Sequence, residues 1–309
     1  MHKIYGILFT VLALTVIVNA EEKKFEDFIP PVSNPVYFES PFHTTEARLI
    51  HIHQELNGDV YTTPLGKAKL NGELTLTALQ LRYAVNERFS IIATKDGYGR
   101  MKYDNTLEDE DGFADIAVGI KYSPYIDYEN QAIITLGLRF ELPTGDRNIF
   151  QGRHEIIANP FISFAKGFDD LHIIGYQGFQ LPFDNEKSST ISHTSLHVDY
   201  KIGNFYPLIE LNWRHILASG GGGPYDADVV AVGGVPVDID TINNNLSGLD
   251  IANLGTSDSE GNNYFDVAFG FRYKITENLT AGFAFETPLS DSKDGLFRER
   301  YTFDLIYTF

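Results

Sequence analysis

Apolar and polar residues alternate with a period of two along most of the chain after residue 45. Segment 264–275 shows the pattern clearly, because one face would be apolar and the other would carry the charges. The apolar face holds Phe265, Val267, Phe269, Phe271, Tyr273 and Ile275, and the opposite face holds Asp266, Ala268, Gly270, Arg272 and Lys274. This alternation predicts β-strands with two unlike faces rather than helices.

The same pattern predicts about twelve strands, each near the ~10 residues that cross a bilayer at a tilt. They lie at 46–56, 73–85, 88–95, 111–123, 131–142, 155–166, 170–182, 189–202, 205–216, 262–275, 278–288 and 298–309. Short and long connections alternate between them. We therefore predict an all-β fold, a transmembrane antiparallel up-and-down β-barrel of the bacterial outer-membrane type. An even strand number would place both chain ends on the periplasmic side.

Three segments organise the chain around this barrel. Residues 1–20 carry Lys3, an apolar run over 7–18 and small residues up to Ala20, which is typical of a secretory signal peptide. Residues 21–45 are polar and rich in proline, and we expect a periplasmic N-terminal lead-in there. Residues 46–309 would form the barrel. We thus expect export to the cell outer membrane of a Gram-negative bacterium.

The last predicted strand ends on an aromatic residue and alternates strictly. Its outward side would carry Tyr301, Phe303, Leu305, Tyr307 and Phe309. This pattern resembles the closing-strand signature that bacterial outer-membrane proteins present to the barrel assembly machinery. Closure also removes an open sheet edge, which hydrocarbon cannot tolerate. We expect outer-membrane lipid and the assembly machinery as partners.

Composition excludes several other classes of protein. The 309 residues include no Cys, which excludes disulfide scaffolds, zinc-thiolate sites and cysteine nucleophiles. The 24 Lys and Arg against 42 Asp and Glu give a net charge of −18, which argues against nucleic acid as a partner. Much of this charge falls in the predicted external loops 96–110 and 217–261, the second of which has no Lys or Arg. We expect no cofactor and no metal site, and we expect 217–261 to act as a constriction or lid.

With the apolar face assigned to lipid, the inward face carries ionisable side chains of both signs. The lumen and selectivity candidates are Asp115, Lys121, Arg139, Glu141, Glu210, Arg214, Asp266, Arg272, Arg300 and Asp304. In a barrel such residues line water or pair across strands. Two interpretations stay open: a structural network of ion pairs that fills a narrow lumen, or a set of charges that determines a channel's selectivity.

One segment has a more specific pattern. It reads Gly-Phe-Ala-Asp-Ile-Ala-Val-Gly-Ile-Lys-Tyr over 112–122, and the next predicted strand ends in Leu-Pro-Thr-Gly-Asp over 142–146. This resembles the outer-membrane family named for transport in the meta-pathway of phenol degradation. The resemblance implies a barrel that moves small solutes, including hydrophobic or aromatic ones. Independently of the resemblance, Asp115 and Lys121 can pair inside the barrel.

Two other functions compete with a passive channel for small solutes. A hydrolase is conceivable, because some outer-membrane phospholipases carry a His and a Ser two positions apart, as His193 and Ser195 are here, with Asn212 on the next strand to orient the His. The period-two pattern argues against a hydrolase, because it places Ser195 on the inward face, away from lipid. We therefore expect that the protein is not an enzyme. The second alternative is a structural or adhesion barrel with acidic external loops.

Overall fold

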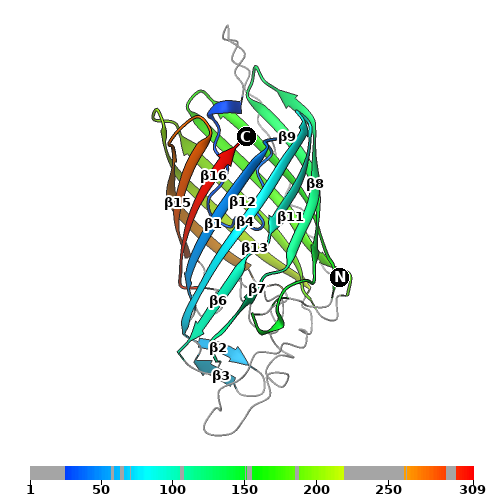
Figure 1. The fold of residues 1–309 in the computed structure, drawn as a ribbon, viewed down its shortest axis with the longest axis vertical. Helices are drawn as coiled ribbons and strands as arrows, with labels where there is room; N and C mark the ends of the chain where they lie inside the picture. The colour runs from blue at the N-terminus through cyan, green and yellow to red at the C-terminus, as the bar shows by residue number, and fades with distance from the viewer. Residues whose placement is uncertain are drawn as a thin grey trace, which may run out of the picture.

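The segments with alternating side chains form long antiparallel strands in the computed structural model (Figure 1). The structure describes residues 25–56, 59–62, 66–69, 71–104, 108–149, 151, 155–184, 188–218, 261, 263–289 and 297–309. The predicted signal peptide 1–20 and nearly all of the predicted lid 217–261 lie outside the described residues.

The described residues contain sixteen strands and two short 3-10 helices. The first strands are β1 (Glu46–Glu55), β2 (Asp59–Thr62), β3 (Gly66–Lys69), β4 (Gly72–Asn86), β5 (Phe89–Lys95), β6 (Tyr98–Tyr103), β7 (Glu110–Phe113) and β8 (Ile116–Asp127). The remaining strands are β9 (Ala132–Leu142), β10 (Ile157–Phe168), β11 (Leu171–Pro182), β12 (Thr190–Tyr200), β13 (Phe205–Ala218), β14 (Asn263–Lys274), β15 (Leu279–Pro288) and β16 (Glu299–Thr308). The helices are η1 (Phe25–Asp27) and η2 (Arg147–Ile149). Apart from the β2–β3 hairpin, all strands belong to one sheet.

This sheet closes into a twelve-stranded antiparallel barrel. Each barrel strand pairs with the next along the chain, and β1 closes the ring by pairing with β4 on one side and β16 on the other. Fourteen strands are named in the sheet, but β5 and β6 pair with successive parts of β4, and β7 and β8 pair with β6 and β5 in turn. β5 and β6 together therefore form one interrupted barrel strand, and β7 and β8 together form another. The predicted fold is confirmed.

The break between β5 and β6 is much shorter than the loop over 96–110 that the sequence predicts. The dipeptide Asp96-Gly97 has the composition of a turn, yet the strand resumes at Tyr98. Gly97 has φ +125°, and an added Cβ would lie 2.7 Å from the backbone oxygen of Thr77. A glycine there lets the strand kink and continue along β4, so the turn composition marks a kink rather than a strand end.

The two ends of the barrel differ in the length of their connections. At one end the turns are short, such as the two residues between β4 and β5. β1 begins at this end and β16 ends there. Helix η1 and the C-terminus share this end, and the β2–β3 hairpin lies at the other (Figure 1). We call these the short-turn end and the long-loop end.

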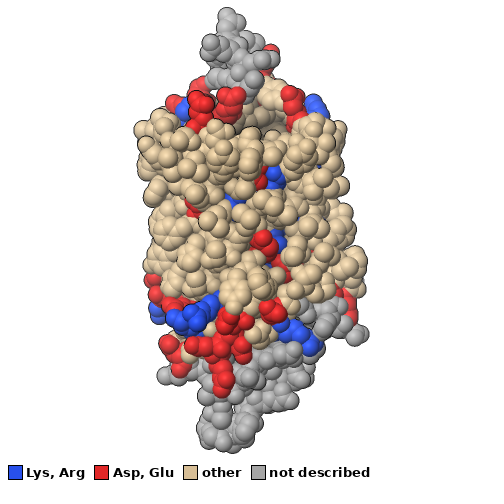
Figure 2. All heavy atoms as spheres, in the orientation of Figure 1, with Lys and Arg blue, Asp and Glu red and all other residues tan. Residues whose placement is uncertain are grey.

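The outward face of the strands is apolar, and the inward face is polar. Large apolar side chains point outward and are exposed, for example Leu79 (46%) and Phe269 (52%). On the face that Figure 2 shows, Lys, Arg, Asp and Glu are concentrated towards the two ends, and other residues cover most of the broad band between them. No helix among the described residues is long and apolar enough to cross a membrane. The apolar belt is the surface that lipid requires.

Candidate functional site

All ten lumen candidates lie on the inside of the barrel, as the alternation predicts. Each is buried, and most of them alternate with more exposed residues along their strands. Asp115 and Lys121 do not form the expected pair: they lie six residues apart, about 20 Å along extended chain. Lys121 binds Glu39 (2.7 Å), and Asp115 accepts from the backbone nitrogen of Gly145 (2.8 Å).

The lumen is occupied by the segment that precedes β1. Residues 28–41, which we call the plug, are buried except for partial exposure of Pro30. This differs from the periplasmic lead-in expected for 21–45. A turn at Asn34 reverses the chain: Asn34 has φ +48° and its carbonyl accepts from the backbone nitrogen of Phe38 (2.9 Å). Asn tolerates this left-handed conformation better than most residues.

The barrel wall holds the plug mainly through hydrogen bonds to the backbone carbonyls of the plug. Pro30 and Pro31 have no N–H, and an extended stretch leaves its carbonyls without partners of its own. Arg272 donates to the carbonyls of Pro30 (2.6 Å) and Pro31 (2.9 Å), and Arg48 donates to that of Pro31 (3.0 Å). Asp304 binds both guanidinium groups, at 2.7 Å from Arg48 Nε and 2.7 Å from Arg272 Nη1. One carboxylate therefore positions two arginines against the proline carbonyls.

The plug carbonyls beyond the turn have similar partners. Gln80 donates to the carbonyl of Pro35 (2.9 Å), Arg139 to that of Val36, and Thr135 to that of Pro41 (2.6 Å). Gln80 of β4 lies directly opposite Arg48 in the β1–β4 register, whereas Thr135 and Arg139 belong to β9, on another part of the wall. Side chains from several strands thus clamp both arms of the plug.

Glu210 accepts hydrogen bonds from two backbone N–H groups of the plug, next to the turn. Val32 N donates to Glu210 Oε1 (2.8 Å) and Ser33 N donates to Oε2 (2.6 Å). A chain of buried side chains supports this carboxylate: His197 Nδ1 lies 2.7 Å from Glu210 Oε1, and its Nε2 lies 2.9 Å from Asp199. The carboxylate is therefore fixed in place before it meets the plug.

Glu39 is the charged side chain that the plug itself contributes. It binds Arg82 Nη2 (2.7 Å) and Lys121 Nζ (2.7 Å) inside the barrel. Burial alone would raise the pKa of Glu39, but the two cations beside it hold that pKa well below its usual range. Glu39 is therefore ionised, and it neutralises part of the positive charge of the wall.

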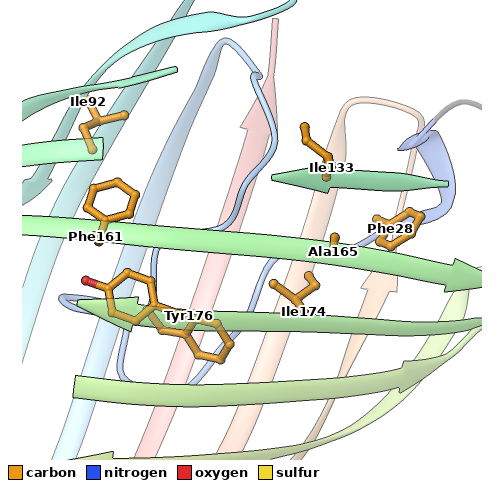
Figure 3. Packing of buried hydrophobic residues seen from close by; sticks show 8 residues of the cluster. Phe28, Ile92, Ile133, Phe161, Ala165, Ile174 and Tyr176 are labelled. Atoms are coloured by element: carbon orange, nitrogen blue, oxygen red, sulfur yellow. The ribbon is translucent and has the colours of Figure 1, made fainter. Parts of the chain in front are cut away.

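Apolar contacts complete the plug near the inner faces of β9, β10 and β11. Phe28 and Phe38 pack in a cluster with Ile133, Phe161, Ala165, Ile174 and Tyr176 of these strands and with Ile92 of β5 (Figure 3). Gly137 makes room for one ring, because an added Cβ would lie 2.1 Å from Phe161 Cζ. The inner wall of this barrel is therefore not polar throughout.

The other candidates form ion pairs with side chains of the wall. Glu141 binds Lys95, Arg214 binds Asp266 (3.0 Å) and Arg300 binds Glu286 (3.0 Å). The sequence did not identify Arg48, Arg82 and Gln80 as plug partners, or His197 as the residue that supports Glu210. The aromatic residues among the prolines of 25–42 were the available signal, since a solvated linker has no use for them.

The arrangement of His193 and Ser195 does not resemble a hydrolase site. Both face inward, as predicted for Ser195, so neither meets lipid. The Ser195 hydroxyl donates to Asn212 Oδ1 (2.7 Å), and the ring of His193 stacks on Tyr37 of the plug (4.1 Å between centroids). The described residues also contain no group of three or more His, Asp or Glu that could hold a metal.

The alternating residues of β16 point to the outside of the barrel. Phe303, Leu305, Tyr307 and Phe309 are all exposed, and Tyr301 is partly exposed. β16 pairs with β1 over its whole length, from Glu46 opposite Thr308 to Glu55 opposite Glu299. The C-terminal strand therefore closes the barrel and carries its aromatic residues on the lipid-facing side.

Comparison with known proteins shows the fold but no sequence family. No family model matches the chain, and no curated protein matches it. Among solved structures, the COG4313 outer membrane channel from Pseudomonas putida F1 is similar, with a TM-score of 0.59 and 10% identity over 91% of this chain and 100% of that chain. The NanC porin (TM-score 0.48, 8% identity, 85% of this chain and 100% of that chain) and the translocator domain of autotransporter NalP from Neisseria meningitidis (0.46, 9%, 86% and 90%) are less similar. The first likeness shows that this chain has the fold of an outer-membrane β-barrel.

Proposed function

We propose that the protein is an outer-membrane channel or transporter for passive passage of small solutes, and that this structure is its closed state. The observation that carries the proposal is the plug, which fills a charged lumen without being part of the sheet. Most of its contacts are hydrogen bonds and ion pairs, which water can replace when the plug leaves. The short-turn end would face the periplasm in a Gram-negative outer membrane, after export by the predicted signal peptide.

The solute class in this proposal includes hydrophobic and aromatic molecules. The resemblance of 112–146 to the phenol-pathway family implies them. The apolar cluster around Phe161 and Tyr176 supports it, because an opened lumen would expose those side chains where Phe28 and Phe38 now lie. Assembly would depend on recognition of the exposed aromatic residues of β16.

A reversible cross-link between plug and wall tests the proposal. The chain has no Cys, so Ser33→Cys with Asn212→Cys introduces a single pair at a contact of 3.0 Å between Ser33 Oγ and Asn212 Nδ2. A short, reducible bifunctional thiol reagent would join them. We expect the cross-linked protein to lose conductance in planar bilayers and solute entry in liposome swelling, and reduction to restore both. The two single-Cys variants, treated in the same way, control for the reagent.

A barrel that passes neither ions nor small solutes before cross-linking or after reduction would refute the channel. That result would favour the structural or adhesion barrel, for which the filled lumen is sufficient.

A further inference from the structure

Two buried side chains near the long-loop end carry hydrogen-bonding atoms that no atom of the described structure satisfies. Arg214 is 4% exposed and Tyr264 is 3% exposed. Among the described residues, Nε and Nη1 of Arg214 and the hydroxyl of Tyr264 find no hydrogen-bond partner. Buried polar groups are paired in the great majority of cases, and each exception calls for a partner such as a ligand or water.

These atoms belong to neighbouring positions on the inner wall. Arg214 of β13 and Tyr264 of β14 are directly opposite each other in the register, and both side chains point inward. Directly opposed residues have Cβ atoms about 4.5–5.5 Å apart. The unsatisfied groups of the two residues can therefore reach one ligand.

The only ion pair of Arg214 among the described residues leaves most of its guanidinium unused. Nη2 binds Asp266 at 3.0 Å, while Nε and both hydrogens of Nη1 remain. A guanidinium only donates hydrogen bonds, and its best acceptors are the oxygens of carboxylates and phosphates. The tyrosine hydroxyl adds one further donor. The two side chains therefore lack acceptor oxygens among the described residues.

We propose that Arg214 and Tyr264 bind a carboxylate or another small oxyanion at the outer part of the lumen. The plug reaches the same row of the wall, because Tyr37 stacks on His193, which lies opposite Arg214 in the β12–β13 register. A solute that enters from the long-loop end would meet this site beside the plug. The role of this site in solute passage rests on the proposed channel function, but oxyanion binding is measured without transport.

The test is calorimetric titration of the mature full-length protein in detergent micelles, in Tris chloride at constant ionic strength. The probes are sodium acetate, sodium phosphate and the neutral acetamide. We expect acetate or phosphate to bind and acetamide not to bind. Acetate binding more tightly than phosphate would assign carboxylate solutes, and the reverse would assign phosphate solutes.

Two conservative variants make the test specific. Tyr264→Phe removes only the unsatisfied hydroxyl, so it should fold normally and weaken oxyanion binding about tenfold, the effect of losing one hydrogen bond to a charged group. Thr302→Val is the matched control, because it removes another buried hydroxyl without a partner, on β16, three strands away from β13. Its oxyanion affinity should equal that of the wild type.

Three results would overturn the site: no binding of either oxyanion, equal binding of acetamide, or an equal loss of affinity in Thr302→Val. The proposed function fails separately. Oxyanion binding in a protein that is impermeable when the plug is free would leave the site in place and refute the channel.

Discussion

Replacing Glu210 with Gln should open the lumen by weakening the plug. The carboxylate accepts from Val32 N through Oε1 and from Ser33 N through Oε2. A Gln side chain has the same shape but only one acceptor oxygen, so its NH₂ group must face one of the two backbone donors. One charge-assisted hydrogen bond, worth about 1.5–3 kcal/mol, is lost, and a buried N–H is left without an acceptor.

Together these effects reduce the free energy of plug docking by about 2–4 kcal/mol. Since 1.4 kcal/mol is a factor of ten, the undocked fraction rises about 30- to 700-fold. We expect a higher open probability in planar bilayers and faster labelling of Ser33→Cys by a small thiol reagent added from the water phase. Both readouts should change together, because they report the same undocking.

Glu286→Gln is the matched control for this change. It also removes one negative charge from the inner wall, but Glu286 binds Arg300 and Asn212, both on the wall, and its link to the plug is indirect, through the contact of Asn212 with Ser33. It should leave Ser33→Cys labelling close to that of the parent. Equal labelling of parent and Glu210→Gln, or an equal increase in Glu286→Gln, would refute the role of Glu210 in holding the plug.

Three further predictions concern stability, pH and assembly. Asp304→Asn leaves Arg48 and Arg272 buried without their shared carboxylate and should destabilise the protein by about 3–5 kcal/mol, measured as a lower urea midpoint in a gel-shift unfolding assay; an unchanged midpoint would contradict it. His43 follows the plug and contacts Ser90 and Ser123 of the wall. Burial and the nearby Lys121 lower the pKa of His43 from 6.5 to about 4, so between these pH values His43 takes up a proton when it leaves the wall with the plug. Plug docking should therefore weaken as the pH falls from about 6.5 to 4, and His43→Gln should remove this dependence of permeability. Phe309→Ser alters a side chain that is 76% exposed, so it should lower the yield in the membrane while leaving the urea midpoint of the purified barrel unchanged; an unaltered yield would count against the assembly signature.

The strands could be predicted from the sequence because their signal is local. The predicted range 46–56 corresponds to Glu46–Glu55, and 262–275 to Asn263–Lys274. Each residue in such a strand meets either lipid or the interior, so polarity alternates wherever the strand runs. The same alternation identified all ten inward candidates. It could not tell which partner each one has, because pairing depends on side chains from distant strands.

The plug could not be predicted in this way. Its contacts join residues far apart in the chain, such as Val32 and Glu210, which are 178 positions apart. The plug also uses mainly backbone carbonyls, and every residue has one, so these contacts leave no pattern of residue types. Prolines suggested a linker, whereas here they supply an extended chain whose carbonyls are available to Arg48 and Arg272.

The chemistry of the plug contacts determines how costly it would be to open the barrel. A hydrogen bond exchanged for water contributes about 0.5–1.5 kcal/mol net, although its gross energy is several times larger. Burial of one Phe side chain contributes about 1.5–3 kcal/mol. Phe28 and Phe38 therefore contribute as much to docking as several of the polar contacts, and they lie in one cluster on β9, β10 and β11. A solute with an apolar surface that binds this cluster would offset the apolar part of that cost, whereas a fully polar solute would not. If the lumen opens, passage should therefore depend on the apolar surface of the solute as well as on its size.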